Sequence, residues 1–195
     1  MPRSGEDARR RLQQAALELF RERGYEATTT AEIAARAGLT ERTFFRHFPD
    51  KREALFDGED AFRAALSEAV LAAPEDLNPM GALLLAFRSV ERVLEGNRSF
   101  SGPRQAVIAQ TPALQERMRT KTAGLVSALS AALRRRGLED GAATLAAQVG
   151  IAAFGYAASA WIDDPAPGLD AHLTRAFDEL HDLSSATRKP GLSVR

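Results

Sequence analysis

Cysteine is absent from this 195-residue sequence, which excludes disulfides and thiolate metal sites. Only three histidines occur, and the sequence contains no nucleophile elbow, phosphate-binding loop or H-E-x-x-H zinc pattern. Asp163 and Asp164 precede His172, but their place beside Pro165 is more typical of a turn than of a metal site. The sequence therefore predicts neither an enzyme nor a bound metal or cofactor.

An excess of charge of one sign is also missing, because 26 basic residues balance 26 acidic residues. Any nucleic-acid surface must therefore be local and cannot cover the whole molecule. The sequence has no run of about 18 apolar residues and no apolar segment near its start. We therefore expect a cytoplasmic protein with no membrane partner.

Apolar residues recur at helical spacing, and no segment shows the alternation of a strand. The pattern predicts an all-α protein of about nine helices. We place the domain boundary after residue 54, with a helix-turn-helix unit in 1–54 and a helical domain in 55–195. The predicted helices cover residues 8–23, 30–37, 41–48, 51–73, 79–94, 105–110, 112–136, 140–161 and 169–183.

The stretch 29–51 contains the signals for two short helices and a tight turn. Thr29 and Glu32 have the spacing of a capping box, which predicts that a helix begins at the next residue. Gly38 ends that helix, because glycine enters the left-handed turn without a Cβ penalty. Thr40 is a new N-cap two residues later. Two short helices joined by such a turn form a helix-turn-helix.

The second of these helices is predicted to have a buried side and a free side. Phe44 anchors it from behind, so that its outer face can enter a DNA major groove, which admits one α-helix. The same spacing fits a solvated helical hairpin in an all-α protein, although we favour DNA binding. The outer face carries hydrogen-bonding or charged side chains, namely Thr40, Glu41, Arg42, Thr43, Arg46 and His47.

The segment ATTTAEIAARAGLTERTFFRHFPDK closely resembles the DNA-binding signature of the TetR family of bacterial transcriptional regulators. An amphipathic first helix that ends in FRERGY and a later KREALF segment also fit this family. The resemblance covers roughly residues 8–56, and beyond residue 60 it is architectural only. It implies a sequence-specific DNA-binding regulator, usually a repressor.

The resemblance also implies a homodimer, in which the eighth and ninth predicted helices pair with their copies as a four-helix bundle. The eighth, 140–161, is rich in alanine and glycine, and the ninth, 169–183, has a stripe of leucine and phenylalanine. Both have more apolar surface than one protomer needs to cover. Two reading helices would meet DNA half-sites roughly 34–36 Å apart, so the operator should be an inverted repeat.

Residue roles follow from the resemblance position by position. Thr28 and Thr29 match family positions that touch phosphate, and a helix N-terminus suits phosphate binding. Lys51 matches a phosphate-contacting lysine. The base-reading positions of the family are matched by Thr40, Glu41, Arg42 and Thr43.

Phe45 stands where the family usually has tyrosine, which is a departure from the pattern. The hydroxyl contact of that tyrosine with phosphate is therefore missing, and Phe45 is left to act by packing. Arg46 or His47 can compensate by contacting phosphate.

Family members usually release DNA when a small molecule fills a cavity between helices of the second domain. The resemblance therefore implies an unknown, mostly apolar effector. Apolar residues at helical spacing form a core more often than a ligand wall, so the assignment competes with plain packing. The candidate effector-binding residues are Phe62, Leu66, Phe87, Met118, Arg119, Gln148, Tyr156 and Trp161.

The alternative function is a ligand-binding or scaffolding helical dimer that does not read a specific DNA sequence. The intact caps at Thr29, Thr40 and Asp50 argue against this alternative, because they preserve the two helices that reading requires.

Overall fold

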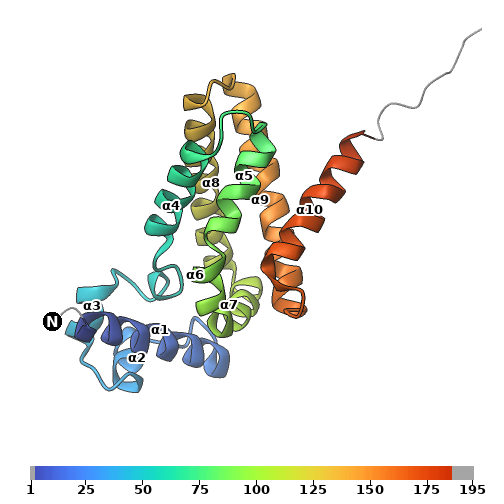
Figure 1. Cartoon of the computed structure of the whole chain (residues 1–195). Coiled ribbons are helices and arrows are strands. Elements are labelled where there is room, and N and C mark those ends of the chain that lie inside the picture. The colour runs from blue at the N-terminus through green and yellow to red at the C-terminus, as the bar shows by residue number, and fades with distance from the viewer. Residues whose placement is uncertain (1–2, 186–195) are drawn as a thin grey trace, which may run out of the picture. The chain divides into compact units, whose positions relative to one another are not determined.

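The computed structural model describes residues 3–185, with side chains from residue 5. Over that range it contains ten α-helices, one 3-10 turn and no strand, so the predicted all-α architecture is confirmed (Figure 1). The elements are α1 (Arg3–Arg23), α2 (Thr30–Arg36), α3 (Glu41–His47), the 3-10 turn η1 (Glu53–Leu55), α4 (Glu59–Ala72), α5 (Pro79–Ser89), α6 (Glu91–Gly96), α7 (Arg98–Gln110), α8 (Pro112–Arg135), α9 (Asp140–Asp163) and α10 (Gly168–Ser185).

The helices group into two compact units. The first contains the described residues up to Ala61 together with Asn97–Ala123. The second contains Phe62–Gly96 and the described residues from Gly124 onward. The first unit therefore takes in α7 and the beginning of α8 as well as the N-terminal helices, and the predicted domain boundary after residue 54 stays a prediction.

Three helix boundaries differ from the prediction. The helix predicted over 51–73 is interrupted at Gly58, which has φ of +79° and separates η1 from α4. The helix predicted over 79–94 divides at Val90 into α5 and α6. The break predicted over 96–103 is reduced to Asn97, because α7 begins at Arg98 and continues through Pro103.

The core of the first unit forms where α1, α2 and α3 meet. Phe44 and Ile33 are fully buried there, and Ala34 is 1% exposed, so α2 and α3 pack closely on α1. Val107, Ile108 and Leu114 extend the same cluster into α7 and α8. The helix-turn-helix therefore rests on a continuous apolar base and is more than an isolated hairpin.

An ionic network fixes the connection that follows the helix-turn-helix. Glu53 in η1 lies 2.5 Å from the Nε of Arg117 on α8. Glu59, the first residue of α4, lies 3.1 Å from the Nζ of Lys121 and 3.4 Å from Arg104. Burial raises the pKa of Glu59, with Lys121 opposing that shift. These pairs hold η1 against α7 and α8 within the first unit.

The second unit has an aromatic core. The rings of Phe87 and Phe154 stack with centroids 4.7 Å apart, and Phe62 and Phe177 each lie 6.2 Å from one of them. Leu83 of α5 packs at Gly150 of α9, where an added Cβ would come within 2.8 Å of its Cδ1. Glycine at that position therefore permits the close crossing of α5 and α9.

Helix α9 is long and apolar enough to cross a membrane by length and composition alone. Only 22% of its apolar window is buried within the chain. A helix apolar on most sides is normally covered on most sides. Much of the apolar surface of α9 is therefore not covered by the other described residues of the chain.

Candidate nucleic-acid interface

A reciprocal pair of hydrogen bonds between Thr29 and Glu32 defines where α2 begins. The Thr29 hydroxyl accepts a hydrogen bond from the Glu32 amide at 3.2 Å, and the Thr29 amide donates to the Glu32 carboxylate at 2.9 Å. The predicted capping box is therefore present. The Thr29 hydroxyl also donates to the Glu32 carboxylate at 2.9 Å, and the bonds that this carboxylate accepts from the Thr29 amide and hydroxyl lower the pKa of Glu32. The carboxylate consequently stays ionised and keeps the first turn of α2 in place.

The turn after α2 has the geometry of a glycine C-cap. Gly38 has φ of +65°, its amide donates to the Ala35 carbonyl at 2.9 Å, and the Leu39 amide donates to the Ala34 carbonyl at 2.8 Å. These two bonds satisfy carbonyls that the end of a helix leaves free. A Cβ at Gly38 would lie 2.7 Å from the Arg11 guanidinium, which donates to the Ala37 carbonyl. The positive φ therefore favours glycine here, and a larger residue would also displace the Arg11 guanidinium.

Helix α3 presents one buried and one exposed side, as its spacing predicts. The Thr40 hydroxyl accepts from the Thr43 amide at 3.2 Å and caps the helix, and Phe44 is fully buried beneath it. Arg42 and Arg46 are exposed, and neither forms an ion pair among the residues that the structure describes. Their guanidinium groups are free to meet an anionic partner.

Glu41 is exposed but already has a partner. Its carboxylate accepts a hydrogen bond from the Thr30 hydroxyl at 2.5 Å. This bond links the first residue of α2 to the first residue of α3. The bond holds the N-terminus of α2 close to the N-terminus of α3. The predicted phosphate-contacting residue Thr29 and the predicted base-reading residues of α3 lie at these two N-termini.

Thr28 does not take the predicted place on the surface. Its side chain is 1% exposed, and its hydroxyl donates to the Gly24 carbonyl at 2.8 Å. The hydroxyl is therefore engaged in closing the loop after α1, and the phosphate contact predicted for Thr28 stays a prediction that would require this bond to break. Thr29 is exposed beside it and remains the candidate of the pair.

Lys51 is held by the same loop. Its ammonium donates to the carbonyls of Tyr25 at 2.7 Å and Thr28 at 2.9 Å, and it lies 4.2 Å from the centre of the Tyr25 ring. The side chain is thus oriented by the loop that precedes α2. Its predicted phosphate contact stays a prediction, since such a contact would share the ammonium with these carbonyls.

His47, the last residue of α3, is half-buried. Its Nε2 atom is buried without a hydrogen-bond partner. Burial lowers the pKa of His47, and the charges of Arg46 and Arg9 lower it further, against a weaker opposing effect of Asp57. A contact with phosphate through this nitrogen would need a rotation of the ring.

The sequence pattern gave no sign of the roles of Arg9 and Arg11 in α1. Arg9 pairs with Asp57 near η1, and its guanidinium lies 5.2 Å from the centre of the Phe48 ring. Arg11 caps the carboxyl end of α2, as described above. The run of arginines at positions 9–11 shows a local positive charge in the sequence. The partner of each arginine depends on how segments distant in the sequence pack together.

The predicted effector residues are distributed over both units, and their role as a ligand site stays a prediction. Leu66, Phe87 and Trp161 are buried in the core of the second unit, and Phe62 packs against it. Gln148 and Tyr156 are exposed on α9, and Tyr156 is 59% exposed. Met118 packs against the core of the first unit, where Arg119 is exposed and paired with Glu116. Within the second unit, therefore, only Phe62, Leu66, Phe87 and Trp161 of the predicted set belong to the core or pack against it.

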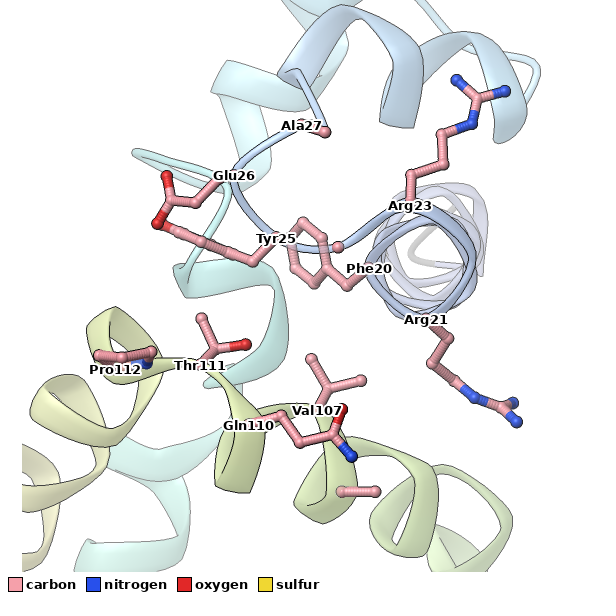
Figure 2. A pocket seen from close by; sticks show the side chains of 12 residues that line it. Phe20, Arg21, Arg23, Tyr25, Glu26, Ala27, Val107, Gln110, Thr111 and Pro112 are labelled. Atoms are coloured by element: carbon pink, nitrogen blue, oxygen red, sulfur yellow. The ribbon is translucent and has the colours of Figure 1, made fainter.

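A partly open hollow of about 500 Å³ lies in the first unit and includes none of these eight residues. Figure 2 shows Phe20 and Tyr25 on one side and Val107, Gln110 and Thr111 on the other. The rings of Phe20 and Tyr25 are 5.1 Å apart and form an apolar wall. The hollow adjoins Tyr25, whose carbonyl binds Lys51, and so borders the loop that supports α2.

Two family models match the chain. The model described as bacterial regulatory proteins, tetR family, matches residues 12–57, which include α2 and α3. The model described as the MftR C-terminal domain matches residues 77–184, more than half of the chain. Together they cover both the helix-turn-helix and the later helices.

Individual relatives agree with these models. The HTH-type transcriptional regulator TcmR of Streptomyces glaucescens is 43% identical over 82 residues, which span 42% of this chain and only 36% of TcmR. The putative mycofactocin biosynthesis transcriptional regulator MftR of Mycobacterium tuberculosis is 28% identical over 201 residues, covering 91% of this chain and 94% of MftR. Thermus thermophilus FadR, solved with lauroyl-CoA, is 25% identical with a TM-score of 0.51, covering 96% of this chain and 98% of FadR.

The surroundings of His47 predict its titration. Because burial and two nearby arginines disfavour the imidazolium, the pKa of His47 should lie below the usual value of about 6.5. The free energy of unfolding should then fall as the pH drops from about 6.5 to the folded-state pKa, since the unfolded chain takes up the proton first. An NMR titration of the imidazole signals measures the pKa, with His47→Gln to assign the resonance. A midpoint at or above 6.5 would contradict this expectation.

Proposed function

The chain belongs to the TetR family of bacterial transcriptional regulators, and from this we propose that it is a cytoplasmic, dimeric repressor of an inverted-repeat operator. In this proposal a small, mostly apolar molecule releases it from DNA. Its relatives are named as transcriptional regulators, and its fold is that of a helix-turn-helix unit followed by further helices.

The exposed side of α3 is the observation that carries the proposal. Arg42 and Arg46 stand free on a short helix whose other side is fixed by buried Phe44. Arginine can bind guanine O6 and N7 with two hydrogen bonds, and glutamate can accept from cytosine N4. We therefore assign base reading to Arg42, Glu41, Thr40 and Thr43, and phosphate contacts to Thr29, Arg46 and Lys51. Phosphate contacts would position the dimer, and base contacts would specify the sequence.

Dimerisation through α9 and α10 is supported by an uncovered stripe on α9. Leu145 is 62% exposed and Tyr156 is 59% exposed, and they lie on the same side of the helix because they are 11 residues apart. Gln148, Ala152 and Gly155 between them are exposed as well. A Cβ added at Gly155 would meet nothing within 4 Å. Small residues on such a stripe would let a second helix approach closely.

The effector proposal rests on the aromatic core of the second unit. Phe62, Phe87 and Trp161 lie in or against that core, and an apolar molecule that entered there would have to separate packed side chains. It can shift the protein away from DNA only by binding the non-DNA conformer more tightly. Because FadR of Thermus thermophilus was solved with lauroyl-CoA, an acyl-CoA is the ligand class that we propose to test first.

Arg42→Ala should reduce discrimination between the operator and unrelated DNA. Loss of a two-bond contact to guanine is expected to cost about 1–3 kcal/mol per half-site. Gel shifts on the promoter region of the protein's own gene, at several salt concentrations, measure this. Arg92→Ala on α6 removes the same charge from an exposed site elsewhere and should change nothing. A wild-type protein that gives no sequence-dependent, salt-sensitive shift would favour the scaffolding alternative.

Gly155→Arg should convert the dimer to a monomer while the protomer stays folded. The site is open within one protomer, so the arginine would disturb only a partner helix that packs there. Sedimentation velocity should show the mass of one chain, with unchanged helical circular dichroism and weaker operator binding. Val93→Arg, at a 58% exposed position on α6, is the matched control and should leave the dimer intact. A Gly155→Arg dimer would disprove this interface.

Lauroyl-CoA should lower operator affinity and change the fluorescence of Trp161. This residue is the only tryptophan and is 4% exposed, so its emission reports on the second core without labelling. Coenzyme A without the acyl chain is the control and should have no effect, because the proposal assigns recognition to the apolar chain. If lauroyl-CoA changed neither the fluorescence nor the gel shift, the acyl-CoA assignment would be wrong.

A further inference from the structure

Helix α3 carries an exposed phenylalanine among its polar residues. Phe45 is 53% exposed, whereas its neighbours Phe44 and Phe48 are 0% and 2% exposed. The rings of Phe44 and Phe45 meet edge to face, with centroids 5.6 Å apart and an angle of 87° between the planes. The buried ring therefore steadies the exposed one, and the rest of the Phe45 ring is left uncovered.

The neighbours of Phe45 belong to the exposed, charged side of the helix. Arg42 lies three residues before it, a spacing at which side chains on a helix are adjacent. Glu41 lies four residues before it, and Arg46 follows it directly. Phe45 itself has no hydrogen-bond donor or acceptor on its side chain. It cannot bind a phosphate oxygen or a polar base edge as these neighbours can.

DNA offers one apolar group to such a residue in the major groove. The C5-methyl group of thymine projects into that groove, and phenylalanine is among the side chains that contact it. We propose that Phe45 is a specificity-determining residue that recognises a thymine methyl group in each half-site. This rests on the proposed function, in which α3 enters the major groove. An apolar contact with deoxyribose would use the same ring but would not distinguish thymine from other bases.

The test removes only the methyl group. The full-length protein first selects duplexes from a randomised library, and each thymine of the selected duplex is then replaced singly by 2′-deoxyuridine. For the wild-type protein we expect one position in each half-site at which the replacement lowers affinity about fourfold, the effect of burying one carbon group. Every other thymine should tolerate the change.

Variants then assign that effect to Phe45. Phe45→Ala should bind the thymine and deoxyuridine duplexes equally, and it leaves the fully buried Phe44 in place, so circular dichroism should show an unchanged helical fold. Phe45→Leu should retain part of the preference because it keeps an apolar group. Arg42→Ala is the matched control on the same helix, and it should bind more weakly while keeping the thymine preference.

The outcomes separate this inference from the proposed function. An enriched sequence without any deoxyuridine-sensitive thymine would overturn the role of Phe45 and leave sequence-specific binding in place. That role would also be overturned if Phe45→Ala retained the thymine preference. If selection enriches no sequence at all, both the proposed function and the role of Phe45 are overturned.

Discussion

At Gly38 the backbone turns into the left-handed region, and the direction of α3 depends on that turn. The φ of +65° is accessible to glycine at little cost, and two hydrogen bonds across the turn close the end of α2. The Arg11 guanidinium fills the space that a side chain would need, which ties the turn to α1. Phe44 then fixes the rotation of α3 about its own axis. Together these contacts decide which side chains of α3 face outward.

The local part of this arrangement could be predicted because its causes are local. The capping box at Thr29 and Glu32, the cap at Thr40 and the turn at Gly38 each depend on residues within four positions of one another. The side chains that are engaged inside the protein could not be found in this way. Thr28 is buried and Lys51 binds loop carbonyls only because α1 and the following loop pack as they do. The periodicity of apolar residues shows which side of a helix is apolar. Which segments contact that side depends on how the helices pack together.

The later helices show the same limit more strongly. Gly58 breaks a helix that its sequence would allow, whereas α7 continues through Pro103, so glycine and proline alone did not locate the boundaries. The candidate effector residues were chosen by helical spacing, and they fall in or against different cores or on the surfaces of α8 and α9. Spacing identifies residues that can be buried together. It does not show whether a core opens to admit a ligand, since that depends on the stability of the packed rings.

The bond between Thr30 and Glu41 has a consequence for selectivity. A base that donates to the Glu41 carboxylate has to compete with a hydroxyl that is already in place at 2.5 Å. A well-placed cytosine amino group can replace that hydroxyl or share the carboxylate, whereas a weaker or misdirected donor leaves the internal bond intact. The Thr30 hydroxyl would thus compete with a DNA base for the Glu41 carboxylate. Only a site that displaces the hydroxyl bears the cost of breaking the Thr30–Glu41 bond, so this bond reduces the net preference that Glu41 can give to cytosine.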